Sequence, residues 1–390
     1  MRVLLLSWEY PPLVVGGLGR HVEALARELC AAGHDVRVVT RGESGSAVDE
    51  RRDGVRVRRA ALDPIAIHFT TETLLAWSQT SEHAMLRAAL PLVRRWRPDV
   101  IHAHDWLVAQ SAVTLAQVTG AALVTTIHAT EAGRHQGWLP QPLNLAIHSV
   151  ERWLVQRSDT VITCSTAMHD EVTRLFEVPD AHVHVVPNGI DVARWRARAR
   201  ARAGEHPLVL FAGRLVHEKG VQTLLEAVRP LRARRPTLRL AVAGTGPYES
   251  SLQARARRLR IARSVDWLGF VPEDELARLF AAADVVVVPS LYEPFGLVAL
   301  EAAAAHTSLV VAEAGGLLDL IADRVATASF PATDVGALVA AVDGVLADPA
   351  AARRAIRRAH RVIRRAYTWS AVAVHTATIY ERARGALTLR

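Results

Sequence analysis

Residues 1–40 read MRVLLLSWEY PPLVVGGLGR HVEALARELC AAGHDVRVVT. Residues 3–6 form a short apolar run that predicts a buried strand, and residues 36–40 form a second one. Between them, the glycine pair at 16–17 precedes a segment whose apolar residues recur at helical spacing and which ends at Gly33. This order predicts a β-loop-α-β unit with parallel strands, because the helix carries the chain back before the second strand begins.

The same alternation recurs along the rest of the chain, where helical segments separate short apolar runs. Strands are predicted at residues 100–103, 123–127, 160–163 and 183–186 in the first half, and at 208–212, 238–243, 265–268, 285–288 and 309–311 in the second. Alternation of this kind predicts α/β domains, in which helices cover both faces of a parallel sheet.

Length and composition indicate two such domains. The chain has 390 residues, of which 50% are hydrophobic and 22% charged, and this suffices for two globular cores. We predict a first domain at residues 1–194, an arginine- and alanine-rich linker at 195–206, and a second domain at 207–368. The last helical segment, at about 369–390, is expected to cross back onto the first domain. Two doubly wound domains in tandem predict a cleft at the carboxyl ends of their strands, where ligands bind.

The positive charge of the chain is clumped. The formal net charge is +8, and arginines gather at 194–202 and at 353–365. Neither cluster carries a series of aromatic residues that could stack on bases, so no nucleic-acid partner is expected. One interpretation of these clusters is a solvated linker and a solvated helix face. The other is a weak contact with an anionic membrane surface.

Cysteine use and apolar runs favour a cytoplasmic location. Cys30 and Cys164 do not make a disulfide framework. The apolar run at residues 1–6 is too short for a signal peptide, and no apolar run approaches the ~18 residues of a membrane span.

Two loops in the second half carry residues suited to an anionic ligand. The first, GRLVHEKG at 213–220, lies between a predicted strand and a predicted helix. Of the 47 lysine and arginine residues, only Lys219 is a lysine, which indicates a position where a wide guanidinium does not fit. Arg214 can fork onto a phosphate, and the amides at the helix start add to an anion site.

The second loop, EPFGLVALEA at 293–302, also follows a predicted strand. Glu293 lies in the loop, and Glu301 lies in a nearly all-apolar helix that Gly296 opens. Burying a carboxylate alone is costly, so Glu301 is expected to have a partner.

These two segments, in this order, resemble the signature of the GT4/GT5 glycosyltransferases, the group that includes the glycogen synthases. Further segments similar to family segments lie at 7–12, 16–19, 102–106, 126–131 and 187–191. The resemblance covers nearly the whole chain and implies the GT-B fold, with two Rossmann-like domains facing a central cleft.

The resemblance also implies roles for individual residues. The expected catalytic residues are Glu293, which contacts the transferred sugar, His128, which hydrogen-bonds it at the reacting face, and Arg214 and Lys219, which hold the departing diphosphate. The expected donor-binding residues are Gly17, Arg214, Lys219, Phe270, Val271, Glu293, Gly296, Leu297, Val298 and Glu301, with Glu301 on the ribose and backbone groups of Phe270 and Val271 on the base. The expected acceptor-side residues are His104, Asp105 and Glu131.

The family forms its new glycosidic bond on the same face as the old one, so the resemblance implies retention of configuration. The leaving phosphate would deprotonate the acceptor, and no metal or other cofactor is expected. Val14 occupies a place where glycogen synthases of the GT5 branch carry a lysine. This difference favours the GT4 branch and leaves the donor nucleotide open.

The resulting hypothesis is a retaining glycosyltransferase that moves glucose from UDP-glucose or ADP-glucose onto an α-1,4-glucan or related saccharide. One alternative is a GT4 transferase with another sugar and a phosphorylated or lipid-linked acceptor. Another is a sugar-nucleotide epimerase on the same fold, and a third is a non-catalytic binding protein.

Two further patterns resemble a metal site and a dinucleotide-binding motif, but each is incomplete. His102 and His104 have a spacing that metal ligands use, but the sequence offers no third ligand beside them. Gly244-Thr245-Gly246 resembles the start of a dinucleotide fingerprint, which Pro247 and a missing third glycine interrupt.

Overall fold

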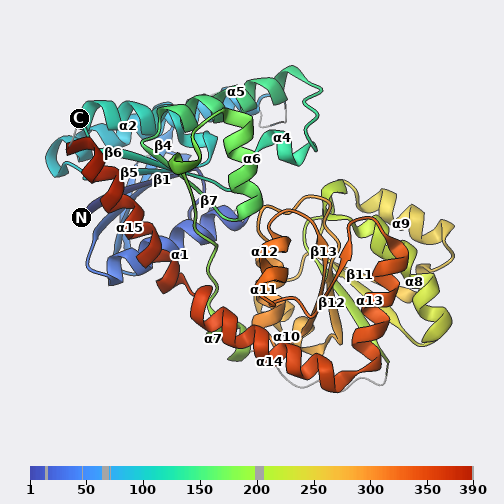
Figure 1. Ribbon diagram of the computed structural model, residues 1–390. Coiled ribbons are helices and arrows are strands. Elements are labelled where there is room, and N and C mark those ends of the chain that lie inside the picture. The colour runs from blue at the N-terminus through green and yellow to red at the C-terminus, as the bar shows by residue number, and fades with distance from the viewer. Residues whose placement is uncertain (14–15, 46, 64–69, 71, 198–205, 389–390) are drawn as a thin grey trace. The chain divides into compact units, whose positions relative to one another are not determined.

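The computed structural model describes residues 1–390 except 14–15, 46, 64–69, 71, 198–205 and 389–390. The chain divides into two compact units (Figure 1). The first unit comprises Met1–Gly189 together with Trp369–Arg390, and the second comprises Ile190–Thr368.

The first unit is built on an eight-stranded sheet with the order β3-β4-β2-β1-β5-β6-β7-β8. Its strands are β1 (Arg2–Ser7), β2 (Asp35–Ser44), β3 (Val48–Arg52), β4 (Val55–Leu62), β5 (Val100–His104), β6 (Ala122–Ile127), β7 (Thr160–Thr163) and β8 (Val183–Val185). Its α-helices are α1 (Gly17–Ala31), α2 (Leu74–Trp96), α3 (Ala109–Thr119), α4 (Glu131–Arg134), α5 (Pro142–Arg157), α6 (Thr166–Phe176) and α15 (Trp369–Thr388), with short 3-10 turns at Trp106–Val108 and Asp180–His182.

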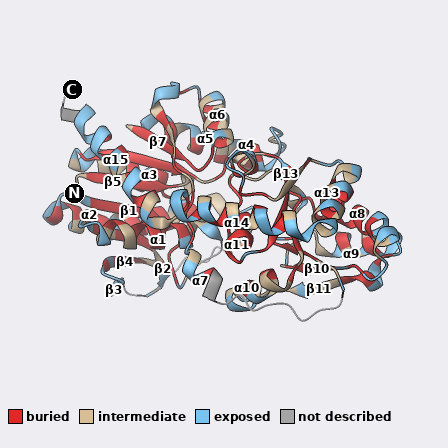
Figure 2. Cartoon of the chain, turned by 60° about the horizontal axis from the view of Figure 1, so that its bottom comes forward, coloured by how far each residue is buried: buried red, intermediate tan, exposed pale blue. Residues whose placement is uncertain are grey.

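Strand β1 shows why this sheet has a helical layer on each face. Val3 and Leu5 pack into the core that α1 and α15 cover, whereas Leu4 and Leu6 pack into the core that α2 and α3 cover. Successive side chains of a strand point to opposite faces, so a continuous apolar run fills two cores at once. In Figure 2 the strands are mostly red, the colour of buried residues.

The second unit is built on a six-stranded, fully parallel sheet with the order β11-β10-β9-β12-β13-β14. Its strands are β9 (Leu208–Ala212), β10 (Arg239–Ala243), β11 (Val265–Gly269), β12 (Val285–Val288), β13 (Ser308–Glu313) and β14 (Ala328–Pro331). Its α-helices are α7 (Val192–Ala197), α8 (Val221–Arg234), α9 (Glu249–Arg258), α10 (Glu273–Ala282), α11 (Leu297–Ala304), α12 (Leu317–Ala322), α13 (Val335–Ala347) and α14 (Pro349–Ala366), with short 3-10 turns at His217–Lys219 and Ala262–Ser264.

Both sheets confirm the predicted doubly wound α/β class. In each, the strand order reverses beside the first strand of the unit, between β1 and β5 and between β9 and β12. The carboxyl ends of parallel strands at such a switch point are where ligands bind in this architecture. All the predicted strands form. Strands β3, β4 and β14 were not predicted. Strand β3 is mostly exposed, arginines interrupt the apolar residues of β4, and β14 is only four residues long.

The chain passes between the units at places that differ in part from the prediction. The first passage falls between Gly189 and Ile190, earlier than residue 194, because the following segment packs on the second unit. There the N–H of Ile190 donates to the carbonyl of Tyr367 at 2.8 Å, and the ring of Trp195 lies 5.7 Å from that of Phe280. Most of the predicted linker, residues 198–205, lies outside the described residues.

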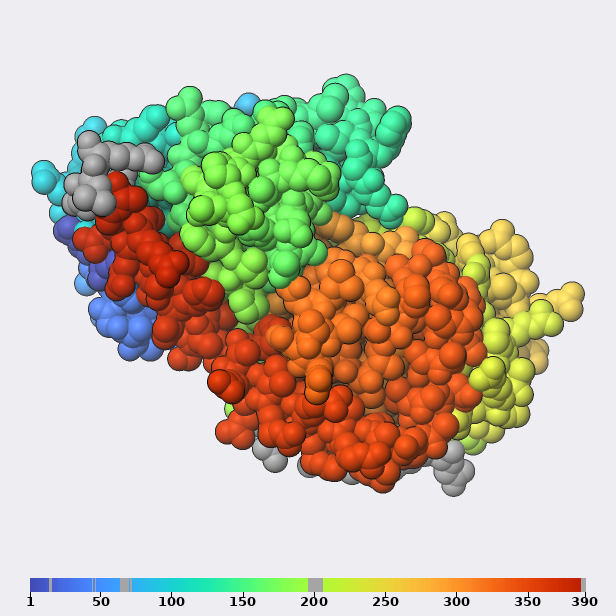
Figure 3. Space-filling model, in the orientation of Figure 1, coloured from blue at the N-terminus to red at the C-terminus, as the bar shows by residue number. Residues whose placement is uncertain are grey.

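The last helix belongs to the first unit, although its sequence follows the second. Helix α15 packs along α1, and Figure 3 shows its red side chains lying on the blue surface of the first unit. Among the described residues, no single helix is long and apolar enough to cross a membrane. Only α13 and α14 taken together have the length and composition, and they are bent by 98°.

Candidate active site

The loops that follow β9 and β10 are packed backbone against backbone. The N–H of Gly213 donates to the carbonyl of Ala243 at 3.0 Å. A Cβ on Gly244 would lie 1.8 Å from the carbonyl oxygen of Gly213, and one on Gly246 would lie 2.3 Å from that of Leu215. Only glycine permits this approach. Gly244 and Gly246 therefore allow the loop after β10 to support the loop after β9. The sequence did not predict this role.

Lys219 and Glu293 form an ion pair between the loops after β9 and β12. The Nζ of Lys219 donates to Oε2 of Glu293 at 2.8 Å, and the Oγ of Ser290 donates to the same oxygen at 3.1 Å. The carbonyl of Glu293 accepts the N–H of Gly316 at 2.8 Å, which holds the backbone in place. Within the described residues, both side-chain bonds of Glu293 end on Oε2, so Oε1 is left for a ligand.

The ion pair depends on a close contact between the two loops. Gly220 has a φ of +69°, and a Cβ there would lie 1.8 Å from the carbonyl oxygen of Pro289. The N–H of Leu291 donates to the carbonyl of Glu218 at 2.8 Å. These backbone contacts bring Lys219 to the end of β12, where Glu293 lies.

Arg214 extends from the same loop toward solvent. Its side chain is 60% exposed, and its guanidinium lies 3.7 Å from the carboxylate of Glu218. An exposed ion pair of this length contributes little to stability. The guanidinium thus keeps most of its donors for an anionic ligand.

Helix α11 begins in the loop that carries Glu293. Gly296 precedes it with a φ of +104°, a left-handed conformation that favours glycine. The first-turn amides of Leu297 and Val298 have no carbonyl partner within the helix, and such amides favour anions. Glu301 lies half-buried on the same helix, whose other residues are mostly buried.

Phe270 and Val271 follow the edge strand β11, two strands from β9 in the sheet order. The ring of Phe270 is 77% exposed. The carboxyl edge of the second sheet therefore carries all the donor-binding residues predicted for the second half of the chain, and the structure joins Lys219 and Glu293 directly.

In the first unit, three histidines meet near the ends of β5 and β6. The Nδ1 of His104 lies 3.1 Å from Nε2 of His128, and the ring centroids of His21 and His128 are 4.7 Å apart. The Nδ1 of His21 lies 2.8 Å from Oδ1 of Asn188, which accepts a hydrogen bond from it. His21 belongs to α1 and was missed by the sequence analysis, because nothing near it in the sequence relates it to the other two.

Burial keeps these imidazoles neutral. It lowers the pKa of His21 and His104 well below the usual range. Burial and, to a smaller extent, the positive charge of Arg134 lower the pKa of His128 to about 3. A neutral His128 is half-buried and can hydrogen-bond a sugar hydroxyl without carrying charge. His104 is fully buried, and it contacts the half-buried His128.

Asp105 and His102 lie near the same histidines, and each is held by its own hydrogen bonds. The carboxylate of Asp105 accepts the backbone N–H of His128 at 2.7 Å, and burial raises the pKa of Asp105 to about 7. The two ring nitrogens of His102 lie 2.7 Å from Tyr380 Oη and from Thr126 Oγ1. With both nitrogens used, His102 is a core residue and takes no part in a metal site.

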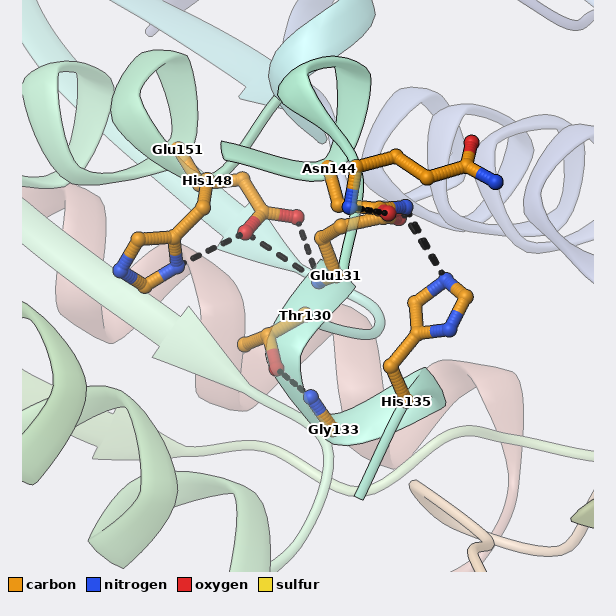
Figure 4. A network of polar contacts seen from close by, with 8 residues as sticks. Thr130, Glu131, Gly133, His135, Asn144, His148 and Glu151 are labelled. Carbon is orange, nitrogen blue, oxygen red and sulfur yellow. Dashed lines mark hydrogen bonds and ion pairs between the residues drawn. The ribbon is translucent and has the colours of Figure 1, made fainter. Parts of the chain in front are cut away.

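The carboxylate of Glu131 is held inside a network at the start of α4 (Figure 4). Its Oε1 accepts from Nδ2 of Asn144 at 2.6 Å and lies 3.3 Å from Nε2 of His135. Its backbone N–H donates to Glu151 at 2.9 Å, and burial raises the pKa of Glu151 to about 9. Glu131 thus shapes the turn that follows His128.

Gly17 is the remaining predicted residue, and it follows the strand β1 in the sequence. Gly17 is the first residue of α1 and is exposed. The N–H of Gly16 donates to the carboxylate of Glu9 at 2.9 Å, which closes the loop onto β1. Val14, the position that distinguished the two family branches, lies outside the described residues.

The histidine cluster is the place in the described residues that suits a metal ion. One ring nitrogen from each of His21, His104 and His128 lies within 4.8 Å of the others. Neutral imidazoles suit transition metals, whereas Mg²⁺ prefers oxygen ligands. The set has no carboxylate among its three members, so it does not fit the magnesium sites used for nucleotide phosphates.

Two family models match the chain. The model described as Glycosyltransferase Family 4 matches residues 15–194, and the model described as Glycosyl transferases group 1 matches residues 193–362. The two matches correspond to the two halves of the sequence.

Similar proteins cover almost the full length. A glycogen synthase of Mycobacterium tuberculosis (strain ATCC 25618 / H37Rv) is 47% identical over 97% of this chain and 94% of its own. A D-inositol 3-phosphate glycosyltransferase of Kineococcus radiotolerans is 34% identical over 98% of this chain and 95% of its own. Among solved structures, the sucrose-phosphate synthase of Thermosynechococcus elongatus superimposes with a TM-score of 0.81 at 25% identity, over 99% of both chains.

Proposed function

The chain belongs to the group 1 and Family 4 glycosyltransferases, and we propose that it transfers glucose from UDP-glucose or ADP-glucose onto an α-1,4-glucan. The resemblance to a glycogen synthase at 47% identity supports the sugar and the class of acceptor. We assign donor binding to the second unit and acceptor binding to the first.

The Lys219–Glu293 pair carries this proposal. It sets one ammonium group and one free carboxylate oxygen, Oε1 of Glu293, at the same strand edge. The ammonium group, Arg214 and the first amides of α11 would stabilise the charge of the departing diphosphate. Oε1 would accept a hydroxyl proton of the glucose.

The proposed reaction is a transfer with retained configuration. The acceptor hydroxyl oxygen bonds to C1 of glucose on the face that the diphosphate leaves, as the bond from C1 to the phosphate oxygen breaks. The departing phosphate oxygen takes the acceptor proton. His128, held neutral by burial, would hydrogen-bond the glucose from the first unit.

We further propose that this reaction needs no metal ion. Arg214, Lys219 and the α11 amides supply the positive potential that a metal would otherwise provide. Incubation with EDTA should leave the rate of nucleotide release unchanged. A loss of rate that Mg²⁺ restores would contradict this proposal.

The first experiment is an assay of nucleoside diphosphate release by the purified protein. UDP-glucose and ADP-glucose are offered separately, each with maltooligosaccharides, with glycogen, and without acceptor. Release that depends on a glucan and on one of the two donors is expected. No release with any glucan would overturn the proposed acceptor, and conversion of the donor without diphosphate release would favour an epimerase.

A phosphorylated acceptor is the second candidate, because the relative with 34% identity is a D-inositol 3-phosphate glycosyltransferase. The same assay with inositol 3-phosphate or glucose 1-phosphate as acceptor tests it. Release with these acceptors and not with glucans would establish this candidate in place of the first.

We also propose that α14 makes a weak contact with an anionic membrane surface. The helix has no acidic residue, and its buried face consists mainly of Ala352, Ala355, Ala359 and Ile363. Its other face exposes the arginines Arg353, Arg354, Arg357, Arg361, Arg364 and Arg365. No ion pair involves these six in the described part of the chain. Such a stripe attracts anionic lipid headgroups at short range.

Cosedimentation with vesicles tests this contact. Binding to phosphatidylglycerol vesicles at low salt is expected, with none to phosphatidylcholine vesicles, and it should weaken at high salt. Replacing Arg353, Arg357 and Arg361 by glutamine should abolish it, whereas replacing the exposed Arg257, Arg258 and Arg260 at the end of α9 should not. Equal binding by both triple variants would refute the assignment to α14.

We propose a cytoplasmic location as well. Within the described residues, Cys30 and Cys164 form no disulfide, which fits a reducing compartment. Cell fractionation tests this location.

A further inference from the structure

Trp138 presents an exposed indole that neither the fold nor the proposed mechanism uses. Its side chain is 71% exposed, whereas Trp8 and Trp96 in the same unit are buried. It lies in the turn between α4 and α5. Tryptophan is enriched at interfaces because it combines a large apolar ring with a polar N–H group, so this turn is a candidate binding surface.

The turn that carries Trp138 is ordered by its own hydrogen bonds. The N–H of Trp138 donates to the carbonyl of His135 at 2.9 Å, and that of Gly137 donates to the carbonyl of Ala132 at 2.7 Å. Below it, Glu131 is bonded to the Asn144 side chain from α5 (Figure 4). The ring is therefore presented on a pre-organised support, and a ligand loses little by ordering it.

This turn lies close to His128. Helix α4 begins at Glu131, and the positive charge of Arg134 lowers the pKa of both His128 and Asp105. The interaction between charges weakens as the distance between them grows. The Trp138 turn and the histidine cluster therefore belong to the same edge of the first sheet.

We propose that Trp138 is a stacking platform for a glucosyl unit of the acceptor chain, away from the end that receives the new residue. This inference rests on the proposed function, because it takes the acceptor to be an α-glucan. A pyranose ring has an apolar C–H face and a rim of hydroxyl groups. It fits a flat indole surrounded by polar side chains, and Arg134, His135 and Gln136 are all exposed beside Trp138.

The surroundings of Trp138 favour a sugar over a protein partner. Stable protein interfaces bury a contiguous apolar core of several hundred Å². Here the residues that precede the indole, 134–137, are exposed, and apart from Gly137 they are polar or charged. After the indole, Leu139 is half-buried and Pro140 and Gln141 are exposed, so the turn offers one aromatic ring without an extended apolar core. Such a surface matches one sugar unit, so longer glucans should gain affinity that short ones lack.

Native gel electrophoresis with and without embedded glycogen tests binding without any donor. Glycogen should retard the wild-type protein and Trp138→Phe, and it should retard Trp138→Ala much less. Val118→Ala, which trims an exposed side chain on α3 of the same unit, is the matched control and should migrate as the wild type does. Equal retardation of Trp138→Ala and wild type would overturn the platform.

Kinetics with acceptors of different length separate this inference from the proposed function. For Trp138→Ala, KM for glycogen should rise about tenfold, a change of about 1.4 kcal/mol, with kcat and the KM for maltose unchanged. Trp138→Phe should recover most of the loss. A uniform change of KM for all acceptor lengths would overturn the inference. If the wild type transfers no glucose at all, the proposed function fails, and retardation in the glycogen gel still decides whether the platform exists.

Discussion

Lys219 holds Glu293 with a compact ammonium group in a chain whose other basic side chains, histidines aside, are all arginine. The side chain of Lys219 is 20% exposed, and the next residue, Gly220, packs against the carbonyl of Pro289. A guanidinium is wider and planar, and it would have to displace this contact to reach Oε2 of Glu293.

The prediction at this scale compares Lys219→Ala with Lys219→Arg. Lys219→Ala should lower kcat by about 10²–10³-fold, the usual cost of removing one group that stabilises developing charge. Lys219→Arg should recover less than a tenth of the wild-type rate, because its charge is kept but its shape is wrong. Steady-state nucleotide release measures both.

Circular dichroism and thermal melting should show that both Lys219 variants are folded. Arg353→Ala, which removes an exposed cation from α14, is the control and should keep the full rate in solution. Wild-type turnover by Lys219→Arg would mean that charge alone matters, and near-normal turnover by Lys219→Ala would remove the residue from the diphosphate site.

At the scale of elements, backbone contacts between loops position the site more than side chains do. The loop after β9 is held by the loop after β10 and by the end of β12. Gly220 is the residue on which the last of these contacts depends, since both its positive φ and its missing Cβ are needed.

A comparison of Gly220→Ala with Gly269→Ala separates the cost of the positive φ from the cost of a clash between loops. Gly220 has a φ of +69° and Gly269 one of +65°, so alanine pays a similar conformational cost of about 1 kcal/mol at both. A Cβ on Gly269 meets nothing within 4 Å, whereas one on Gly220 clashes with Pro289.

Gly220→Ala should therefore be less stable than Gly269→Ala by a further ~1–3 kcal/mol, which is the usual range for forced overpacking. Denaturant unfolding of the two variants gives the comparison. Equal stabilities of the two variants would show that the segment at Pro289 can shift at little cost in free energy.

At the scale of the whole molecule, the last helix returns to the first unit and contributes to its core. Tyr380 of α15 is fully buried, and its hydroxyl lies 2.7 Å from Nδ1 of His102 on β5. The ring of His102 in turn lies 4.1 Å from that of His104. Through Tyr380 and His102, helix α15 thus supports the side chain of His104 at the carboxyl end of β5.

Tyr380→Phe should destabilise the protein by about 1–3 kcal/mol, because it leaves Nδ1 of His102 buried without a partner. Thr378→Ala, on the exposed side of the same helix, should change the stability by less than about 0.5 kcal/mol. Thermal or denaturant unfolding measures both. A Tyr380→Phe variant as stable as the control would mean that the bond contributes nothing to the fold.

The sequence predicted most of the fold, because strands and helices leave local patterns. It also placed the donor-binding residues proposed for the second half of the chain in loops that the structure brings to one edge of the second sheet. Short apolar runs at helix-sized intervals require a parallel sheet, and loops at the carboxyl ends of such strands hold ligands. Lys219 could be singled out because it is the one lysine of the sequence. The β3–β4 pair left no such pattern and was missed, as was the supporting role of Gly244 and Gly246.

By itself, then, the sequence determined the α/β class, the strand positions and which loops carry charged groups, since periodicity and composition are local properties. The tertiary structure alone decided which of those groups meet. His21 and Asn188 are 167 residues apart, and His102 and Tyr380 are 278 apart. Such pairs depend on the order of strands in the sheet and on the return of α15, and both are set by how the cores pack over the entire chain.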